Sequence, residues 1–388
     1  MIEGQDSSAG RRVRLGMVGG GQGAFIGAVH RIAARLDDQY NFVAGALSSQ
    51  AGKAMASAAE LGLEPDRSYP DYQTMADAES AREDGIEVVA IVTPNHVHFP
   101  AAKAFLEAGI HVICDKPMTV TSQEGEELVA LANEKDLILA VTYNYTGYPM
   151  VRQARAMVAN GELGRIRLVQ VEYVQDWLSE DLESSGQKQA AWRTDPAQSG
   201  AGGAIGDIGT HAYNMACFVS GLEAESLCAD LSSFVAGRRL DDNAQVMLRY
   251  PDGVRGMLWA SQVAPGNENN LMLRVYGEKG GLKWRQEDPN YLEFTPLGEP
   301  TRRITRGGSG SGDSAARVTR IPSGHPEGYL EGFTTIYTEV ADAIRAARIG
   351  SPVDPAVLFP TGEDGVKGVR FVEAVVQSSR GDAAWVSL

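Results

Sequence analysis

The stretch RLGMVGGGQGAFIG, residues 14–27, decides the fold of the first half of the chain. Its opening residues predict a short strand, three glycines follow at Gly19–Gly21, and a helix-compatible run over residues 28–36 comes next. A strand, a glycine turn and a helix in this order are typical of a unit that binds a dinucleotide. The glycines allow a tight turn and a close approach of the backbone to a pyrophosphate, whose charge the amides at the helix N-terminus then face.

The spacing of these glycines departs from a regular G-x-G-x-x-G. Either Ala24 occupies the last place of the motif, or the loop is three residues longer and Gly27 is the glycine that lets helix and strand pack. The sequence leaves both interpretations open. In this stretch the residues expected to contact a cofactor are Gly19, Gly21, Gln22, Ala24, Phe25 and Ile26.

The end of the next predicted strand, residues 42–47, bears on the choice of cofactor. An NAD enzyme usually carries an acidic residue there for the ribose hydroxyls. This chain has Ser48 and Ser49 instead, followed by Lys53, which suits a 2′-phosphate. We expect these three residues to lie at the ribose of either NAD or NADP, with NAD slightly favoured.

A third strand is predicted over residues 86–92, and Thr93, Pro94 and Asn95 follow it. With His98 they are expected to lie under the nicotinamide half of the dinucleotide. His96 and His98 form an H-x-H pair that can chelate a metal, but a turn from loop to helix explains both and no third ligand is apparent nearby. The sequence therefore predicts no metal site.

A fourth strand, residues 109–113, runs into Cys114-Asp115-Lys116-Pro117. A lysine at the carboxyl end of a strand in an α/β sheet points into the crevice where such folds bind ligands. The alternative is a surface lysine that merely closes the strand. With a fifth strand at residues 137–141, the alternation of strands and helices predicts a doubly wound parallel sheet, and we expect residues 1–142 to form this α/β Rossmann domain.

Beyond residue 150 the sequence pattern changes, because it predicts a helix, then an alternating strand and two hairpins. We therefore expect residues 143–388 to form a second α/β domain with an open, mostly antiparallel sheet. The helix is expected over residues 150–160, the strand over 166–175, the hairpins over 246–260 and 271–285, a long loop over 302–323, and a core-facing helical stripe over 329–344.

The segment GGAIGDIGTH, residues 202–211, holds a candidate catalytic pair. Asp207 and His211 are four residues apart, so on a helix they share a face. A carboxylate beside an imidazole sets its tautomer and raises its basicity, as a general base requires. In the alternative interpretation Asp207 caps the helix and His211 is a core residue. Trp177 and Arg193, in polar surroundings, suit recognition of a sugar or polyol, or are ordinary packing groups.

Composition narrows the partners and the compartment. The formal net charge is −15, spread along the chain, which argues against nucleic acid or an anionic membrane as a partner. The three cysteines are far apart and form no C-x-x-C, so a reducing cytoplasm is the simplest location. No apolar run reaches membrane-spanning length, and the polar start, Met1 to Arg12, does not resemble a signal peptide.

Taken together, these motifs give a chain that resembles the Gfo/Idh/MocA family of oxidoreductases over essentially its whole length beyond Arg12. The resemblance is carried by Gly19–Gly21, Thr93–Asn95, the Lys116-Pro117 segment and residues 206–211. The family usually has Glu-Lys-Pro where this chain has Asp115 before Lys116, and the glycine loop is three residues longer.

The resemblance implies a Rossmann domain and an α/β domain whose open sheet often forms the oligomer interface, and thus a homodimer or homotetramer. The implied reaction is reversible hydride transfer between nicotinamide and a carbinol carbon of a sugar or cyclitol. Lys116 would hydrogen-bond the reacting oxygen, His211 would accept the hydroxyl proton, and Asp207 would orient His211 or bind a neighbouring hydroxyl. The expected cofactor contacts also include Asp115 and Lys116. The expected substrate contacts are Lys116, Asn144, Trp177, Arg193, Asp207, His211 and His325. Of these, His325 is a candidate to act across a subunit interface.

Two other functions fit the same motifs. One is a glycoside hydrolase that uses transient oxidation by tightly held NAD. The other is a non-catalytic nucleotide-binding regulator, which would need a lost lysine or histidine, whereas Lys116 and His211 are both present.

Overall fold

The computed structural model describes residues 10–388, with the side chains of Lys188, Gln189 and Ala191 left out. The prediction that the chain start is no signal peptide rests largely on residues 1–9, which lie outside the described residues. The chain divides into two compact units. Of the described residues, unit 1 comprises 10–119, 123–144 and 330–365, and unit 2 comprises 120–122, 145–329 and 366–388.

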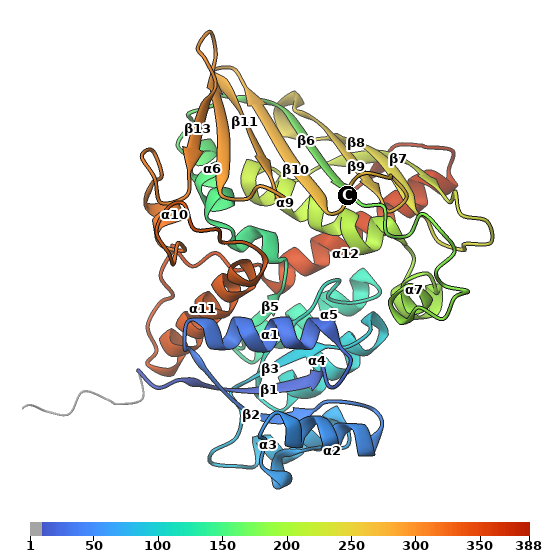
Figure 1. Cartoon of the computed structure of the whole chain (residues 1–388), viewed down its shortest axis with the longest axis vertical. Coiled ribbons are helices and arrows are strands. Elements are labelled where there is room, and N and C mark those ends of the chain that lie inside the picture. The colour runs from blue at the N-terminus through green and yellow to red at the C-terminus, as the bar shows by residue number, and fades with distance from the viewer. Residues whose placement is uncertain (1–9) are drawn as a thin grey trace, which may run out of the picture. The chain divides into compact units, whose positions relative to one another are not determined.

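Unit 1 is built on a five-stranded parallel sheet with the order β2-β1-β3-β4-β5 (Figure 1). The strands are β1 (Val13–Gly19), β2 (Tyr40–Ala46), β3 (Val88–Val92), β4 (His111–Cys114) and β5 (Leu139–Val141). All five residues of β3 are buried, which requires cover on both faces of the sheet, as in a doubly wound fold. The predicted Rossmann fold is confirmed.

The strand order places the binding crevice of unit 1. The chain reverses its direction across the sheet between β1 and β3, and ligands of open α/β sheets bind at the carboxyl ends of the strands at such a point. Gly19 and Val92 end these two strands. The helices are α1 (Phe25–Leu36), α2 (Ala51–Glu60), α3 (Tyr72–Ser80), α4 (His98–Glu107) and α5 (Ser122–Glu134), with short 3-10 turns η1 (Pro65–Arg67), η2 (Asn95–Val97) and η3 (Asn144–Gly147).

Helix α11 (Tyr329–Arg348) belongs to unit 1 almost entirely, so the expected continuous segments 1–142 and 143–388 differ from the observed division. The cause is its apolar stripe, which is core as predicted but the core of the Rossmann unit. Tyr40 donates to the Tyr337 carbonyl at 2.6 Å, and His30 Nδ1 lies 2.8 Å from the Tyr337 hydroxyl.

Unit 2 contains a nine-stranded sheet with the order β13-β12-β11-β10-β6-β9-β8-β7-β14. Its pairs are antiparallel except β6 with β9, so the mostly antiparallel sheet and both predicted hairpins, β8–β9 and β10–β11, are confirmed. The strands are β6 (Ile166–Val174), β7 (Ser226–Ser232), β8 (Asn243–Arg249), β9 (Arg255–Ser261), β10 (Asn270–Gly277), β11 (Gly280–Arg285), β12 (Tyr291–Pro296), β13 (Arg302–Thr305) and β14 (Val386–Ser387).

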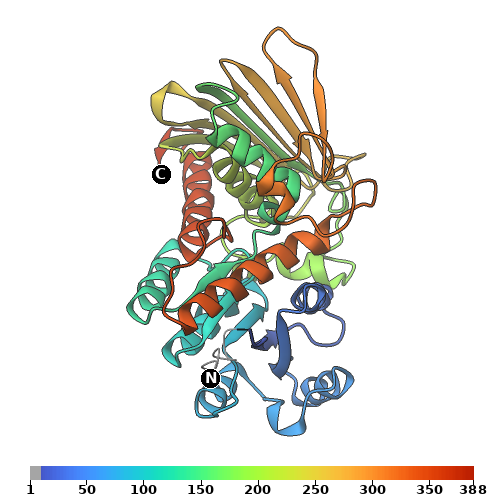
Figure 2. The same ribbon diagram turned by 90° about the vertical axis from the view of Figure 1, so that its left-hand side faces the viewer.

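Helices cover one face of this sheet (Figures 1 and 2). Core residues of α6, α9 and α12, such as Met150, Ala212 and Phe371, form one apolar cluster with inward residues of the strands. The bounds are α6 (Pro149–Ala159), α7 (Lys188–Arg193), α8 (Pro196–Ser199), η4 (Ile205–Gly209), α9 (Thr210–Ser220), η5 (Pro251–Gly253), α10 (Asp313–Ala316) and α12 (Gly362–Arg380). The opposite face carries exposed apolar side chains, which are Leu168, Met247, Met257, Trp259 and Tyr276.

The predicted loop over residues 302–323 is more ordered than expected, since it contains β13 and α10. The reason is Arg306, which is 1% exposed. Its guanidinium donates to the Asn290 side chain at 2.7 Å and to the Ile321 carbonyl at 2.6 Å, and pairs with buried Glu327 at 2.8 Å. One buried cation therefore holds together a segment whose composition alone indicates a loop.

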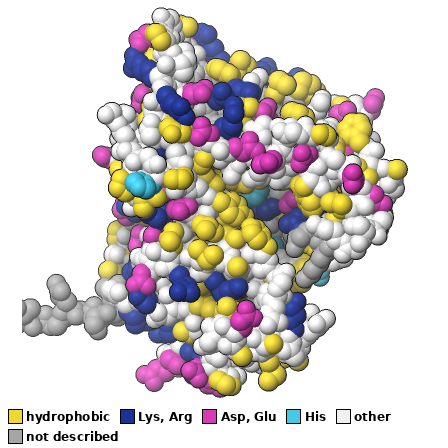
Figure 3. Space-filling view, viewed as in Figure 1, with side chains coloured by type: hydrophobic (Ala, Val, Ile, Leu, Met, Phe, Trp, Pro, Cys, Tyr) yellow, Lys and Arg dark blue, Asp and Glu magenta, His cyan; other side chains and the backbone are white. Residues whose placement is uncertain are grey.

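Two surface observations bear on partners. Within the described part of the chain, no helix is both long and apolar enough to cross a membrane. On the face drawn in Figure 3, basic and acidic side chains are interspersed.

Candidate active site

The glycine turn after β1 is shaped for close approach. Gly19 has a φ of +80°, and a Cβ there would lie 2.9 Å from the Val92 carbonyl oxygen. Gly20 has a φ of +72°, and a Cβ there would lie 2.9 Å from the Cα of Gly27. A Cβ on Gly27 would in turn overlap Gly20. Gly27 is therefore the glycine at which helix and strand pack, and Ala24 is the N-cap residue of α1.

The same loop offers backbone amides to an anion. The amide of Gly21 donates to the Leu47 carbonyl at 3.1 Å, and that of Gln22 donates to the Ser57 hydroxyl at 3.0 Å, which anchors the loop. Among the described residues no side chain caps the N-terminus of α1, so its first-turn amides suit a pyrophosphate. Phe25, 69% exposed, and Ile26 begin this helix.

The end of β2 lacks a carboxylate, as its sequence requires. The hydroxyl of Ser48 accepts from the amide of Gln50 at 3.2 Å, and Ser49 is exposed. Lys53 lies in the first turn of α2 and is half-buried. The three residues are close in sequence and present hydroxyls and one cation at this strand end.

His98 has a different position from the cofactor contact expected of it. Its Nδ1 lies 2.7 Å from the Pro117 carbonyl oxygen, and its Nε2 lies 2.8 Å from that of Thr93. Burial lowers the pKa of His98, while the nearby Asp115 charge and the two carbonyls oppose that shift. With both ring nitrogens facing carbonyls, His98 joins the end of β3 to the Lys116-Pro117 segment and is not placed to hold a cofactor or metal. The Thr93 hydroxyl beside it is buried and has no hydrogen-bond partner among the described residues.

Lys116 follows β4, and its neighbours fix the backbone around it. The carboxylate of Asp115 accepts from the Lys116 amide at 2.9 Å and from the Thr142 hydroxyl at 2.8 Å. The amide of Asp115 donates to the Ile91 carbonyl at 3.0 Å. Asp115 therefore ties the ends of β3, β4 and β5 together, and a half-buried Lys116 stands at that edge of the sheet. Asn144, after β5, is buried, and its side-chain nitrogen has no hydrogen-bond partner among residues 10–388.

In unit 2, Asp207 and His211 lie one turn apart on a continuous helix. Asp207 belongs to η4, a π-helical turn closed by a hydrogen bond from the Thr210 amide to the Ile205 carbonyl. His211 is in the first turn of α9. Such single π turns occur frequently at functional sites. The buried carboxylate of Asp241 starts this helix, because it accepts from the amides of Gly203 at 2.6 Å and Ile205 at 2.8 Å.

The carboxylate of Asp207 contacts side-chain donors from Gln262 and Arg193. The side-chain nitrogen of Gln262 donates to its Oδ2 at 2.9 Å, and Arg193 Nε lies 3.3 Å from the same oxygen. The guanidinium of Arg193 stacks on Trp192 at 4.3 Å. The structure thus brings together Arg193 and Asp207, two of the predicted residues. Trp177, a third, donates its indole N–H to Gln175 at 3.0 Å.

His211 lies among tyrosines. Its ring is 5.0 Å from that of Tyr145 in an edge-on arrangement and 6.1 Å from that of Tyr173. The sequence did not point to Tyr145, Tyr173, Gln175, Gln262 or Asn269 as site residues. Their positions at or just beyond the ends of strands are the one signal that could have found them.

His325 is exposed and lies in the segment held by Arg306, which donates to its carbonyl. Within the described residues, no hydrogen bond links its side chain to the network around Asp207. Among residues 10–388, no group of three His, Cys, Asp or Glu side chains is placed to hold a metal ion.

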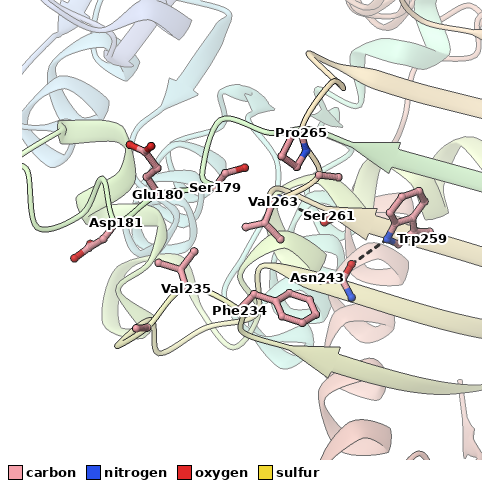
Figure 4. Close-up of a pocket in the computed structure, with 12 residues that line it drawn as sticks. Ser179, Glu180, Asp181, Phe234, Val235, Asn243, Trp259, Ser261, Val263 and Pro265 are labelled. Atoms are coloured by element: carbon pink, nitrogen blue, oxygen red, sulfur yellow. Dashed lines mark hydrogen bonds between the residues drawn. The ribbon is translucent and has the colours of Figure 1, made fainter.

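A hollow of about 680 Å³ opens in unit 2 at the ends of β8 and β9 (Figure 4). Trp259, whose indole N–H donates to Asn243 at 2.9 Å, and the exposed Phe234 line it. None of the predicted site residues is part of its lining.

Comparison with known proteins identifies the family of both halves of the chain. Residues 13–143 match the family model of an oxidoreductase family with an NAD-binding Rossmann fold, and residues 151–283 match the GFO/IDH/MocA C-terminal domain. The uncharacterised oxidoreductase YfiI of Bacillus subtilis is 37% identical over 96% of both chains. Levoglucosan dehydrogenase of Pseudarthrobacter phenanthrenivorans is 28% identical, over 97% of this chain and 98% of that one.

Solved structures match this chain over 97% of its length. An oxidoreductase from Sinorhizobium meliloti is 58% identical with a TM-score of 0.88, covering 97% of this chain and 99% of that one. An inositol dehydrogenase homologue from Azotobacter vinelandii, complexed with NADH and myo-inositol, is 36% identical with a TM-score of 0.91, covering 97% and 98%.

Proposed function

The chain belongs to the Gfo/Idh/MocA family of oxidoreductases, and from this premise we propose that it oxidises a ring hydroxyl of a cyclitol, a sugar or a glycoside by reversible hydride transfer to a nicotinamide cofactor. That it is an oxidoreductase with an NAD-binding Rossmann domain follows from the family itself. The proposal concerns the substrate class and the residues that act on it.

The observation that carries the proposal is the Asp207–His211 turn. Oxidation of a carbinol removes a proton from oxygen and a hydride from carbon, so it needs a base for the proton. His211 is in a buried, tyrosine-lined position, and the carboxylate of Asp207, which is also paired with Arg193, lies one turn before it on the same helix. We assign proton transfer to His211 and its orientation to Asp207.

Lys116 is assigned to the reacting oxygen. A cation there stabilises negative charge that develops as the O–H bond breaks. Asp115 supports this role, because it fixes the Lys116 backbone at the edge of the sheet. When bound, nicotinamide supplies the hydride acceptor. The glycine turn, which a Cβ would fill, and the buried hydroxyl of Thr93 fit a dinucleotide in unit 1.

The substrate class rests on relatives and on the polar groups of unit 2. One relative is a levoglucosan dehydrogenase, and one neighbour was solved with myo-inositol. Arg193, stacked on Trp192, and the indole of Trp177 present the planar and hydrogen-bonding groups that polyols need. We include Asn144 as a further contact, and His325 as one that would act from a partner subunit.

The test is direct. Incubation of the protein with NAD or NADP and a panel of cyclitols, sugars and glycosides should raise the absorbance of reduced cofactor. Lys116→Ala should lower kcat by about 1,000-fold while cofactor affinity changes little, because the loss falls on the transition state. The exposed Lys135→Ala is the matched control. No reduction with any panel member overturns the proposal, and release of aglycone without net reduction would favour a redox-assisted hydrolase.

We propose NAD as the preferred cofactor, because the family description and the inositol-bound neighbour both name NAD or NADH. Lys53 is the residue that argues for NADP, since it is the cation nearest in sequence to the end of β2. The ratio of kcat/KM for the two cofactors decides between them.

We also propose a homo-oligomer formed through the open face of the nine-stranded sheet. Met247 and Met257 are 54% and 58% exposed there, and large exposed apolar patches mark interaction sites. Their strands are adjacent, with these two residues directly paired. Light scattering should report a dimer or tetramer for the protein, and Met257→Glu should shift it toward monomer; a monomeric wild type contradicts this.

A further inference from the structure

Five polar side chains that sequence patterns did not single out form one hydrogen-bonded chain in unit 2. It runs from Tyr145 through Tyr173, Asn269, Gln175 and Gln262, and it ends on the carboxylate of Asp207. The links are Tyr145 to Tyr173 at 2.6 Å, Tyr173 to Asn269 at 2.8 Å, Gln175 to Asn269 at 2.7 Å, Gln262 to Gln175 at 3.4 Å, and Gln262 to Asp207 at 2.9 Å. The chain therefore joins the tyrosine that touches the His211 ring to the carboxylate one turn before it.

The direction of each hydrogen bond in this chain is determined. The Asn269 side-chain oxygen accepts from Tyr173 and from Gln175, so the Tyr173 proton is committed and Tyr145 must donate to Tyr173. At the other end, the Gln262 amide nitrogen donates both to Gln175 and to Asp207. A carboxylate only accepts when ionised, so this orientation of the amide is complementary to a charged Asp207.

Backbone hydrogen bonds at the ends of strands hold these hydrogen-bonded side chains in place. The amide of Gln262 donates to the Asp242 carbonyl at 2.9 Å, and its carbonyl accepts from Leu178 at 3.1 Å. The amide of Gln175 donates to the Ser261 carbonyl at 2.8 Å. Gln262 is 2% exposed, so its side-chain amide has little access to water, and its hydrogen bonds therefore restrain it strongly.

Electrostatics at the Tyr145 end are consistent with this arrangement. Burial raises the pKa of Tyr145, and its hydrogen-bonded neighbours only partly oppose that shift. Burial also raises the pKa of Tyr173. Both phenols keep their protons, and this row of hydrogen bonds requires those protons.

We propose that Gln262 is a positioning residue that, through Gln175 and Asn269, fixes the Asp207 carboxylate and the Tyr145 ring about His211. Its neutral amide restrains the carboxylate without placing a charge or a titrating group beside it. The inference rests on the proposed function, because it assumes that Asp207 and His211 act in catalysis.

The decisive variant is Gln262→Glu, which keeps the side-chain length and replaces the N–H donor by a group that titrates. At low pH the two facing carboxyl groups share a proton and the contact survives. At higher pH both carboxyl groups ionise, and they repel each other and displace Asp207, because the single cation of Arg193 on the same Asp207 oxygen cannot neutralise two negative charges. Activity of the variant relative to wild type should therefore fall by about tenfold or more between pH 6 and pH 9, whereas a purely structural defect would lower it by a constant factor.

The matched control is Gln73→Glu on α3, where an exposed amide likewise donates to a carboxylate, that of Asp77 at 3.0 Å, and this change should leave the profile unchanged. Tyr173→Phe provides a second variant that keeps the ring and removes only the hydroxyl. It should fold like wild type and lower kcat by about fivefold with little change in cofactor KM, since it uncouples Tyr145 from the chain.

The outcomes separate this inference from the proposed function. A Gln262→Glu profile parallel to wild type, together with an inactive His211→Asn, overturns the role of Gln262 alone. Full activity of both Lys116→Ala and His211→Asn instead overturns the proposed function. Thermal unfolding of each variant identifies any loss caused by misfolding, in which case Tyr173→Phe decides.

Discussion

The two units build their candidate sites by different means. In unit 1 the site is mostly backbone and short consecutive stretches, such as Gly19–Gly21 after β1 and Asp115-Lys116 after β4. In unit 2 it is a side-chain network whose members come from β6, α7, η4 and the ends of β9 and β10. Backbone sites depend on strand order and on small residues, whereas network sites depend on buried polar partners. The two units should therefore fail in different ways.

The largest contrast is expected between Gly27→Ala and His211→Asn. The alanine Cβ would overlap Gly20, force α1 away from β1, and weaken cofactor binding, because helix and strand can no longer pack closely. His211→Asn should instead lower kcat by about 1,000-fold with cofactor affinity retained. Fluorescence titration with NADH and steady-state kinetics measure the two effects.

Gly52→Ala is the control for the first of these, since a Cβ there meets nothing within 4 Å. If Gly27→Ala binds NADH as tightly as wild type, the assignment of Gly27 as the packing glycine is wrong.

The next contrast concerns buried ion pairs in unit 2. Arg306→Met should lower the free energy of unfolding by about 3 kcal/mol, because it leaves Glu327 buried without its cation and frees the segment up to residue 327. Arg303→Met, three residues earlier, removes a pair whose side chains are 56% and 57% exposed and should cost less than about 1 kcal/mol. Urea unfolding compares the two variants; equal losses would show that burial is not what gives the Arg306 pair its strength.

Acidification should change folding stability in opposite directions through one titrating residue in each unit. Burial lowers the pKa of His30 in unit 1 to about 4, from 6.5 in the unfolded chain. The unfolded state therefore binds the proton first, and His30 stabilisation, complete above pH 6.5, is lost as the pH falls toward 4, by about 3 kcal/mol in all. Burial raises the pKa of Asp241 in unit 2 to about 6, so protonation there favours the folded state between pH 6 and pH 4.

Stability measured from pH 7 to pH 4 checks both signs. His30→Gln should lose stability less steeply than wild type on acidification, and the exposed His96→Gln is its control. Asp241→Asn should lose it more steeply, because the compensating proton is gone. Equal slopes for His30→Gln and wild type would rule out His30 as a source of the acid sensitivity.

The smallest expected effect is at the end of β2. Lys53→Ala should lower kcat/KM with NADP by about threefold and leave that with NAD nearly unchanged, because water still screens the charge of this half-buried cation. Initial rates with both cofactors measure it. A loss that is equal for the two cofactors would place Lys53 away from the 2′ position.

The sequence by itself determined the strands, helices and turn residues that local patterns predict. Alternation of apolar strands and helices predicted the parallel sheet, and glycine turns and strand ends located Gly19, Thr93 and Lys116. The period-two pattern of residues 166–175 predicted a half-buried strand. These features depend on backbone conformation and on neighbours close in the chain, so spacing reveals them.

Tertiary structure alone decided the rest. It showed that Gly27, and not Ala24, is the residue at which helix and strand pack, and that α11 belongs to the Rossmann unit. It also showed that the segment around Arg306 is ordered and that His98 contacts two backbone carbonyls. It also joined Gln262 to Asp207, which is 55 residues away in sequence. Such contacts form between residues far apart in the chain, and a buried polar side chain takes whatever partner the packing brings within hydrogen-bonding distance. No spacing in the sequence encodes that partner.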